Sequence, residues 1–95
     1  MSISFSGEVI EWRGPAPFYF VPLPLDIAAE IKADEKLISY GWGVIPVSGI
    51  IGKTRFTTSL IPREGTYYLP IKNAVRIPES LQVGEEIRVE FSLGS

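Results

Sequence analysis

Apolar and polar residues alternate along much of the chain, which predicts a mainly β fold. Residues 3–12, ISFSGEVIEW, place Ile3, Phe5 and Val9 on one face at a period of two, as in a half-buried strand. From Ile87 to Phe91, apolar and charged residues alternate in the same way. Strands are therefore predicted at residues 3–12, 18–23, 37–47, 53–61, 67–69 and 87–93.

Two short helices are expected between these strands. Pro24 stands where helices favour their first residue, and apolar residues follow at helical spacing from Leu25 to Ile31. Asp26 in the first turn and Lys32 in the last turn complement the helix dipole, so a helix is predicted at 24–33. A second helix is predicted at 70–77, and turns are predicted at 13–17, 48–52, 62–65 and 80–85.

The two predicted helices lie in segments that resemble one another. Residues 20–31, FVPLPLDIAAEI, align without a gap with residues 66–77, TYYLPIKNAVRI. The alignment pairs Leu23-Pro24 with Leu69-Pro70, Leu25 with Ile71, Ala28 with Ala74 and Ile31 with Ile77. Such a repeat predicts two half-barrels fused in one chain, each closing the sheet edges that the other leaves open.

Length and composition indicate one globular domain. The 95 residues suffice for one modest core, so residues 1–95 are predicted to form a single domain. Hydrophobic residues make up 45% and charged residues 21%, as in an ordinary folded protein. The sequence has no apolar run of membrane-spanning length, and its first residues lack the basic and apolar regions of a signal peptide. A cytoplasmic location without membrane contact is therefore expected.

The absence of cysteine and histidine narrows the chemistry. Disulfides, thiolate nucleophiles and thiolate metal sites are excluded, and so are the commonest metal ligand and the commonest general base near neutral pH. The acidic pairs Asp34-Glu35 and Glu85-Glu86 lie in a predicted helix end and a predicted turn, where solvated charge is the favoured interpretation. We therefore predict no metal, no cofactor and no catalytic residue.

Charge argues against nucleic acid as a partner. The net charge is −2 and the isoelectric point is near 5.1, whereas nucleic-acid binders usually present a basic face. The basic residues are unevenly distributed, because residues 1–52 hold three against six acidic ones while residues 53–95 hold six against five. The second half is therefore predicted to carry a local positive patch that suits a small anion or an acidic protein partner.

Residues 41–91 combine several motifs that together resemble a known family. They are Gly-Trp-Gly, an Ile-Gly turn, Thr-Ser-Leu-hydrophobic-Pro, and Tyr-hydrophobic-Leu-Pro-hydrophobic-Lys followed by Val-Arg. The chain is similar here to the small bacterial and archaeal family catalogued as domain of unknown function 1905, and residues 5–24 also fit it. Phe56 departs from the pattern, since tryptophan is expected before Thr-Ser.

The resemblance implies a fold and leaves the activity open. Members look like closed β-barrels capped by helices, grouped with the double-split barrels of swapped-hairpin transcription factors and antitoxins. We therefore predict a mainly β protein, a closed double-split β-barrel with two short capping helices and an internal pseudo-two-fold repeat. The family has no established activity, and a fold shared with DNA binders is weak evidence for DNA binding.

Lys72 and Arg76 are the first candidate site. They are four residues apart in the second predicted helix, hence on one face, and could hold an anion beside the helix N-terminus. The alternative is that they pair with carboxylates or face water.

Ser59 and Trp42 are weighed against structural roles. Ser59, at a predicted strand end, would need a lysine such as Lys53 or Lys72 as its base, and ordinary hydroxyl hydrogen bonding is favoured. Trp42 lies between two glycines that could leave one ring face open to a ligand, although filling a barrel core is the more frequent use.

Three hypotheses about function follow. The first is a non-enzymatic module that binds a small anion or a protein partner through a ligand-binding set consisting of Trp42, Arg55, Ser59, Lys72 and Arg76. The second is nucleic-acid binding by analogy with the swapped-hairpin barrels. The third, an enzyme that uses Lys72 or a carboxylate, has the least support.

Overall fold

A computed structural model describes residues 2–12, 17–33 and 44–94 of the chain. Seven strands and two short helices make up this part, so the mainly β prediction is confirmed. In chain order they are β1 (Ser2–Glu8), β2 (Ile10–Trp12), β3 (Phe18–Pro22), α1 (Leu25–Ala33), β4 (Ile45–Ile51), β5 (Thr54–Arg63), β6 (Thr66–Ile71), α3 (Asn73–Arg76) and β7 (Glu86–Leu93).

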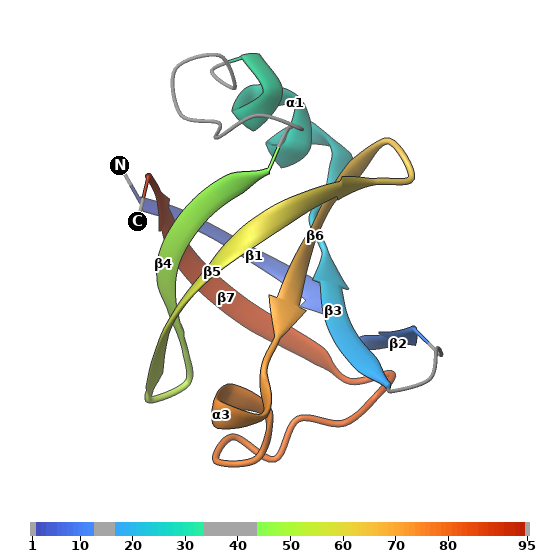
Figure 1. Cartoon of the computed structure of the whole chain (residues 1–95), viewed down its shortest axis with the longest axis vertical. Helices are drawn as coiled ribbons and strands as arrows, with labels where there is room; N and C mark the ends of the chain where they lie inside the picture. The colour runs from blue at the N-terminus through green and yellow to red at the C-terminus, as the bar shows by residue number, and fades with distance from the viewer. Residues whose placement is uncertain (1, 13–16, 34–43, 95) are drawn as a thin grey trace.

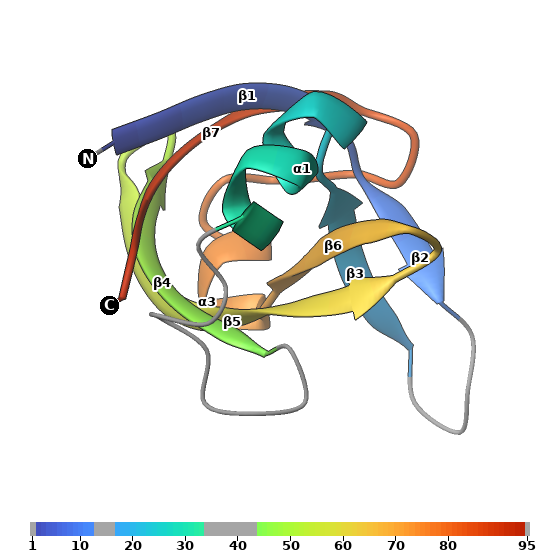
Figure 2. The same cartoon turned by 90° about the horizontal axis from the view of Figure 1, so that it is seen from above.

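The strands form one antiparallel sheet in the order β1-β7-β4-β5-β6-β3-β2. The sheet curls into an open half-barrel (Figure 2). The apolar core side chains lie on its inner face. Its two ends are β1 and β2, which Val9 alone separates in the chain. The predicted closed, double-split barrel is not confirmed, because the strand order is that of an open sheet.

The two helices lie at opposite ends of the half-barrel (Figure 1). In α1, Ala28 and Ile31 face the core, and the Ala28 N–H donates to the Pro24 carbonyl as the helix begins. Leu25 departs from the expected apolar face, since it is 68% exposed. Among the described residues, no helix is long and apolar enough to cross a membrane.

The second helix is much shorter than predicted. Only Asn73–Arg76 are helical, while Pro70 and Ile71 belong to β6. The cause is long-range pairing: Ile71 pairs with Tyr19 of β3 and is buried, which holds the chain extended past the proline. The same Leu-Pro dipeptide therefore leads into a helix after β3 and continues a strand in β6.

The two segments aligned in the predicted internal repeat agree in part of their strands and differ in their helices. Strands β3 and β6 are neighbours, and Pro22 pairs with Tyr68, the residue that the gap-free alignment places opposite it. The aligned leucines Leu23 and Leu69 are both buried. The helical positions differ, because Ile31 is 1% exposed whereas Ile77 is 63% exposed. The pseudo-two-fold repeat of the whole chain thus stays a prediction.

Two-residue turns connect β4 to β5 and β5 to β6. The first is Gly52-Lys53, so most of the predicted turn at 48–52 is in fact strand. Gly52 has φ +60, a conformation that glycine adopts at low cost. The second turn is Glu64-Gly65, with φ of 53 and 77, as in the mirror-image turns that suit twisted hairpins.

The core lies on the inner face of the curved sheet. In β7, buried Ile87, Val89 and Phe91 alternate with exposed charged residues, as the sequence pattern predicted. The rings of Phe5 and Phe91 meet edge to face, with centroids 6.0 Å apart. The buried members of the core are Phe5, Val9, Val21, Leu23, Ala28, Ile31, Ile45, Val47, Ile51, Leu60, Tyr67, Leu69, Ile71, Val75, Leu81, Ile87, Val89 and Phe91.

Glu79 ties the tip of the β4–β5 hairpin to the segment after α3. Its Oε2 accepts hydrogen bonds from the Thr54 hydroxyl at 2.6 Å and from the Lys53 backbone N–H at 3.1 Å. The pKa of Glu79 lies below its ordinary value of 4.5. The main cause is the hydrogen bond from the Thr54 hydroxyl, and the second is the bond from the Lys53 backbone, because both favour the charged carboxylate.

Substitution of Gly49 by alanine is expected to destabilise the sheet. An added Cβ would lie 2.3 Å from the Glu90 carbonyl oxygen and 2.8 Å from the Phe91 Cβ, and a paired backbone carbonyl cannot move aside easily. We expect a loss of about 1–3 kcal/mol in the free energy of unfolding, measured by chemical denaturation. Ser48→Ala, on the outer face, is the control. A Gly49→Ala protein as stable as this control would contradict the packing described.

Substitution of Glu79 by glutamine should change how stability depends on pH. Because the folded-state pKa is depressed, the carboxylate stabilises the fold above about pH 4.5, and this contribution is lost as pH falls through the folded-state pKa. The melting temperature of Glu79→Gln should lie below that of the unmodified protein at pH 7, and the difference should shrink on acidification. Glu30→Gln, on the exposed side of α1, controls for the lost charge. A difference that stays constant down to pH 3 would speak against this role.

Candidate functional site

The outer face of β2, β3, β6 and the end of β5 carries large apolar side chains that remain in contact with solvent. Trp12 is 44% exposed and Phe18 is 50% exposed, and the sheet register places them opposite each other. Phe20 pairs with Pro70 in the next row. Since residues directly opposite one another in a sheet share a face, these side chains form one continuous outer surface.

These side chains line a groove of about 620 Å³, called here the aromatic groove. The Trp12 and Phe18 rings lie 6.3 Å apart between centroids, and the Phe20 and Tyr68 rings lie 5.8 Å apart. Its main apolar members are Trp12, Phe18, Phe20, Ile61, Tyr68 and Pro70. Its size falls within the range typical of small-molecule sites.

Two cations lie along the aromatic groove. The Arg63 guanidinium is 5.2 Å from the centroid of the Trp12 ring, within the range of a cation–π contact. Lys72 also lines the groove. No aspartate or glutamate stands among the described residues that line it. The groove therefore combines aromatic surface with positive charge.

The predicted anion site between Lys72 and Arg76 has a different geometry from the one expected. Lys72 precedes α3 with an extended backbone, and its Nζ donates to the Thr57 carbonyl of β5 at 3.3 Å. The Arg76 guanidinium donates to Asn73 Oδ1 and packs over the Tyr19 ring of β3, 4.5 Å from its centroid. The two cations therefore contact different strands and do not share one helix face.

Ser59 and Lys72 do come together, in a hollow of about 590 Å³ beside β5, called here the Ser59–Lys72 hollow. Ser59 lies in the middle of β5, half-buried, and not at a strand end as expected. Within the described part of the chain, neither Lys72 Nζ nor any other side chain forms a hydrogen bond with the Ser59 hydroxyl. In this arrangement the Lys72 amine is hydrogen-bonded to a backbone carbonyl and not to the Ser59 hydroxyl.

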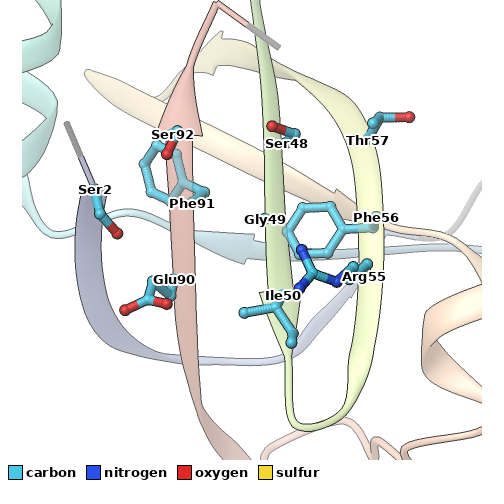
Figure 3. Close-up of a pocket in the computed structure, with 10 residues that line it drawn as sticks. All are labelled: Ser2, Ser48, Gly49, Ile50, Arg55, Phe56, Thr57, Glu90, Phe91 and Ser92. Carbon is cyan, nitrogen blue, oxygen red and sulfur yellow. The ribbon is translucent and has the colours of Figure 1, made fainter.

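Arg55 lines a third hollow, of about 530 Å³, on the outer face of β1, β7, β4 and β5 (Figure 3). The register aligns Ser2, Ser92, Ser48 and Thr57 in one row of hydroxyls across these strands. In the next row, Ile50 stands between Glu90 and Arg55. Positive and negative charge are mixed on this face, which therefore lacks the electrostatic character of the aromatic groove.

Trp42, the remaining predicted site residue, lies outside the described residues, as do Arg13 and the pair Asp34-Glu35. Sequence reasoning missed Trp12, Phe18 and Arg63 as site residues. The segment FYF at 18–20 held a signal, since period-two alternation places Phe18 and Phe20 on the face opposite Tyr19 and Val21. Which of two apolar faces turns outward depends on pairing with β6.

The exposed aromatics are expected to contribute little to folding. Phe18→Ala should change the free energy of unfolding by less than about 1 kcal/mol, because the ring is half-exposed. Phe91→Ala, at a residue 1% exposed, should cost about 3–5 kcal/mol. Urea denaturation of both variants tests the contrast, and equal losses would show that the Phe18 ring is needed for the fold.

Comparison with known proteins places the chain in a family without adding an activity. No curated protein matches the chain. The family described as Domain of unknown function (DUF1905) matches residues 5–91, which include every strand except the first residues of β1 and the last residues of β7. The match covers most of the chain and agrees with the resemblance found in its motifs. The protein is therefore a member of the domain of unknown function 1905 family.

Proposed function

We propose that this protein is a non-enzymatic binding module whose ligand is a small anion with a flat apolar body. The observation that carries the proposal is the aromatic groove with Arg63 held over its exposed Trp12 ring. The apolar body of the ligand would stack on Trp12 and Phe18, and its anionic group would pair with Arg63 or Lys72.

Several physical arguments favour a ligand at this position. Half-exposed tryptophan and phenylalanine side chains gain little for folding, whereas a ligand that covers them removes apolar surface from water. Clustered exposed apolar surface typically marks interaction sites. The positive groove in a protein of net charge −2 also favours a small anion over a long phosphate backbone.

A non-enzymatic role is supported by the state of the reactive side chains. Lys72, the base available to Ser59, donates to a backbone carbonyl.

The closed barrel belongs to the same proposal. Strand β1 runs into β2 through Val9, whose backbone exchanges hydrogen bonds with Gly84 and Glu85 beside β7. This bent first strand begins at one end of the sheet order and finishes at the other, so we propose that it closes a double-split barrel. A closed scaffold would hold the groove residues of β2 and β3 rigidly.

The test compares two arginines on the outer side of β5. Thermal shift and tryptophan fluorescence would be recorded with 1-naphthoate, phenyl phosphate, inorganic phosphate and a short oligothymidine. We expect 1-naphthoate or phenyl phosphate to raise the melting temperature, inorganic phosphate alone to have no effect, and Arg63→Gln to weaken binding about tenfold.

Arg55→Gln is the matched control, since it removes the same charge from the same face of the same strand outside the groove. Its affinity should equal that of the unmodified protein. The proposal fails if neither aromatic anion binds, or if Arg55→Gln weakens binding as much as Arg63→Gln does. Binding of the oligothymidine alone would replace it with nucleic-acid binding by base stacking.

A further inference from the structure

Strand β5 changes partners along its length, and part of one of its edges is not paired with any described strand. Its ladder with β4 extends from Thr54 to Leu60, whereas its ladder with β6 includes only Ile61, Pro62 and Arg63. From Arg55 to Leu60, no described strand pairs with the side of β5 that faces away from β4. This side of β5 is called here the open edge.

The hairpin geometry shows which backbone groups face the open edge. In a two-residue hairpin the residues that flank the turn form a hydrogen-bonded pair, and such pairs then alternate. Thr54, Phe56, Thr58 and Leu60 therefore bond to β4. Arg55, Thr57 and Ser59 direct their N–H and C=O groups toward the open edge.

Pro70 stops β6 from covering this edge. The Leu23 N–H donates to the Tyr67 carbonyl at 2.9 Å, so Tyr67, Leu69 and Ile71 bond toward β3. Their neighbours Tyr68 and Pro70 direct their backbone toward β5. Tyr68 pairs with Ile61, but the next residue to bond would be Pro70, which has no N–H to give to Ser59.

A side chain occupies part of the open edge. Lys72 Nζ donates to the Thr57 carbonyl, and the Ser59–Lys72 hollow lies alongside, bounded by Ile61 and Pro70. We propose that an extended segment of a partner protein adds to β5 as a strand at Thr57 and Ser59. A backbone N–H of the segment replaces Lys72 Nζ as the donor to the Thr57 carbonyl. The Lys72 amine is then free to pair with an acidic side chain of the segment.

The two faces of β5 define the chemistry of the added strand. The side chains of Arg55, Thr57 and Ser59 face outward, whereas Phe56 and Leu60 face the core. A matching strand alternates acidic residues on the outer side with apolar residues on the inner side. No carboxylate is present among the described residues of the hollow, so the segment's acidic groups meet positive charge without competition.

This second site goes beyond the proposed groove ligand and does not depend on it. The two sites share Lys72, Ile61 and Pro70, but the open edge recognises a peptide backbone while the groove recognises a flat ring. Arg63 lines the groove and not the hollow, so Arg63→Gln should leave peptide binding unchanged even where it abolishes binding of 1-naphthoate.

The first measurement is amide hydrogen exchange by NMR on the free protein. The amides of Thr58 and Leu60 should exchange slowly, and those of Thr57 and Ser59 should exchange at least about tenfold faster. Equal protection at all four amides would mean that the edge is already paired, and it would overturn the proposal.

The second measurement is fluorescence anisotropy with a labelled, capped peptide of alternating valine and glutamate. Binding should protect the Thr57 and Ser59 amides from exchange. In an antiparallel ladder, directly opposed residues share a face and bond to each other in alternate pairs. The glutamates face outward, as Thr57 and Ser59 do, so they lie opposite these residues. The backbone N–H and C=O groups of the glutamates are therefore the ones that bond to β5. N-methylation of the glutamates should weaken binding at least about tenfold, and N-methylation of the valines should be tolerated.

Charge is tested with two lysines. Lys72→Gln should weaken binding of the valine–glutamate peptide about fivefold or more. Lys53→Gln, at the exposed hairpin turn, should leave the affinity for this peptide unchanged. A peptide of alternating valine and lysine should not bind. Absence of binding by the glutamate peptide, or equal affinity of both N-methylated forms, would overturn the proposal.

Discussion

The missing N–H of Pro70 is the constraint on which the outer surface depends. Strands β5 and β6 start as a regular hairpin, and their ladder stops at Ile61 and Tyr68, one bonded pair before the proline. Beyond that point β5 pairs with β4, while β6 pairs with β3 through Leu69 and Ile71. A proline in a strand interior would ordinarily cost a ladder hydrogen bond. Here its nitrogen faces β5 beyond the end of the β5–β6 ladder, so the sheet can divide without losing a bond on the β3 side.

The same residue joins the two hollows that lie on either side of it. Pro70, Ile61 and Lys72 line both the aromatic groove and the Ser59–Lys72 hollow. Toward β2 the surface is aromatic, and Arg63 is the nearby charge. Toward β4 it consists of hydroxyls and an incompletely bonded strand edge. Lys72 lies between them, because its extended backbone before α3 lets its side chain reach across to β5. One cation can therefore contribute to either surface.

The sequence predicted those features that depend on local pattern. Alternation in β7 and the helix after Pro24 are confirmed, and so are the hairpin between β4 and β5 and the mainly β fold. The helix predicted from Pro70 was mostly wrong, since pairing of Ile71 with Tyr19 decides the conformation there. The site was harder to predict for a related reason. Lys72 and Arg76 suggested an anion pocket only while both were placed on one helix. Trp12 and Phe18 became a candidate surface only once the structure showed that they pair and that their face of β2 and β3 turns outward.

The packing of the interior bears on where the proposed sites lie. Larger barrels hold a ligand in their centre, but a small barrel fills its interior with side chains. Here the inner face carries Val21, Val47, Leu60, Leu69 and Val89 with no exposed surface, and no buried polar or charged residue lies among the described residues. The described part of this interior therefore offers an anion no buried polar side chain as a partner. Both proposed sites therefore lie on the outer face, where the groove presents exposed rings with a nearby cation and the edge of β5 presents backbone groups that no described strand pairs.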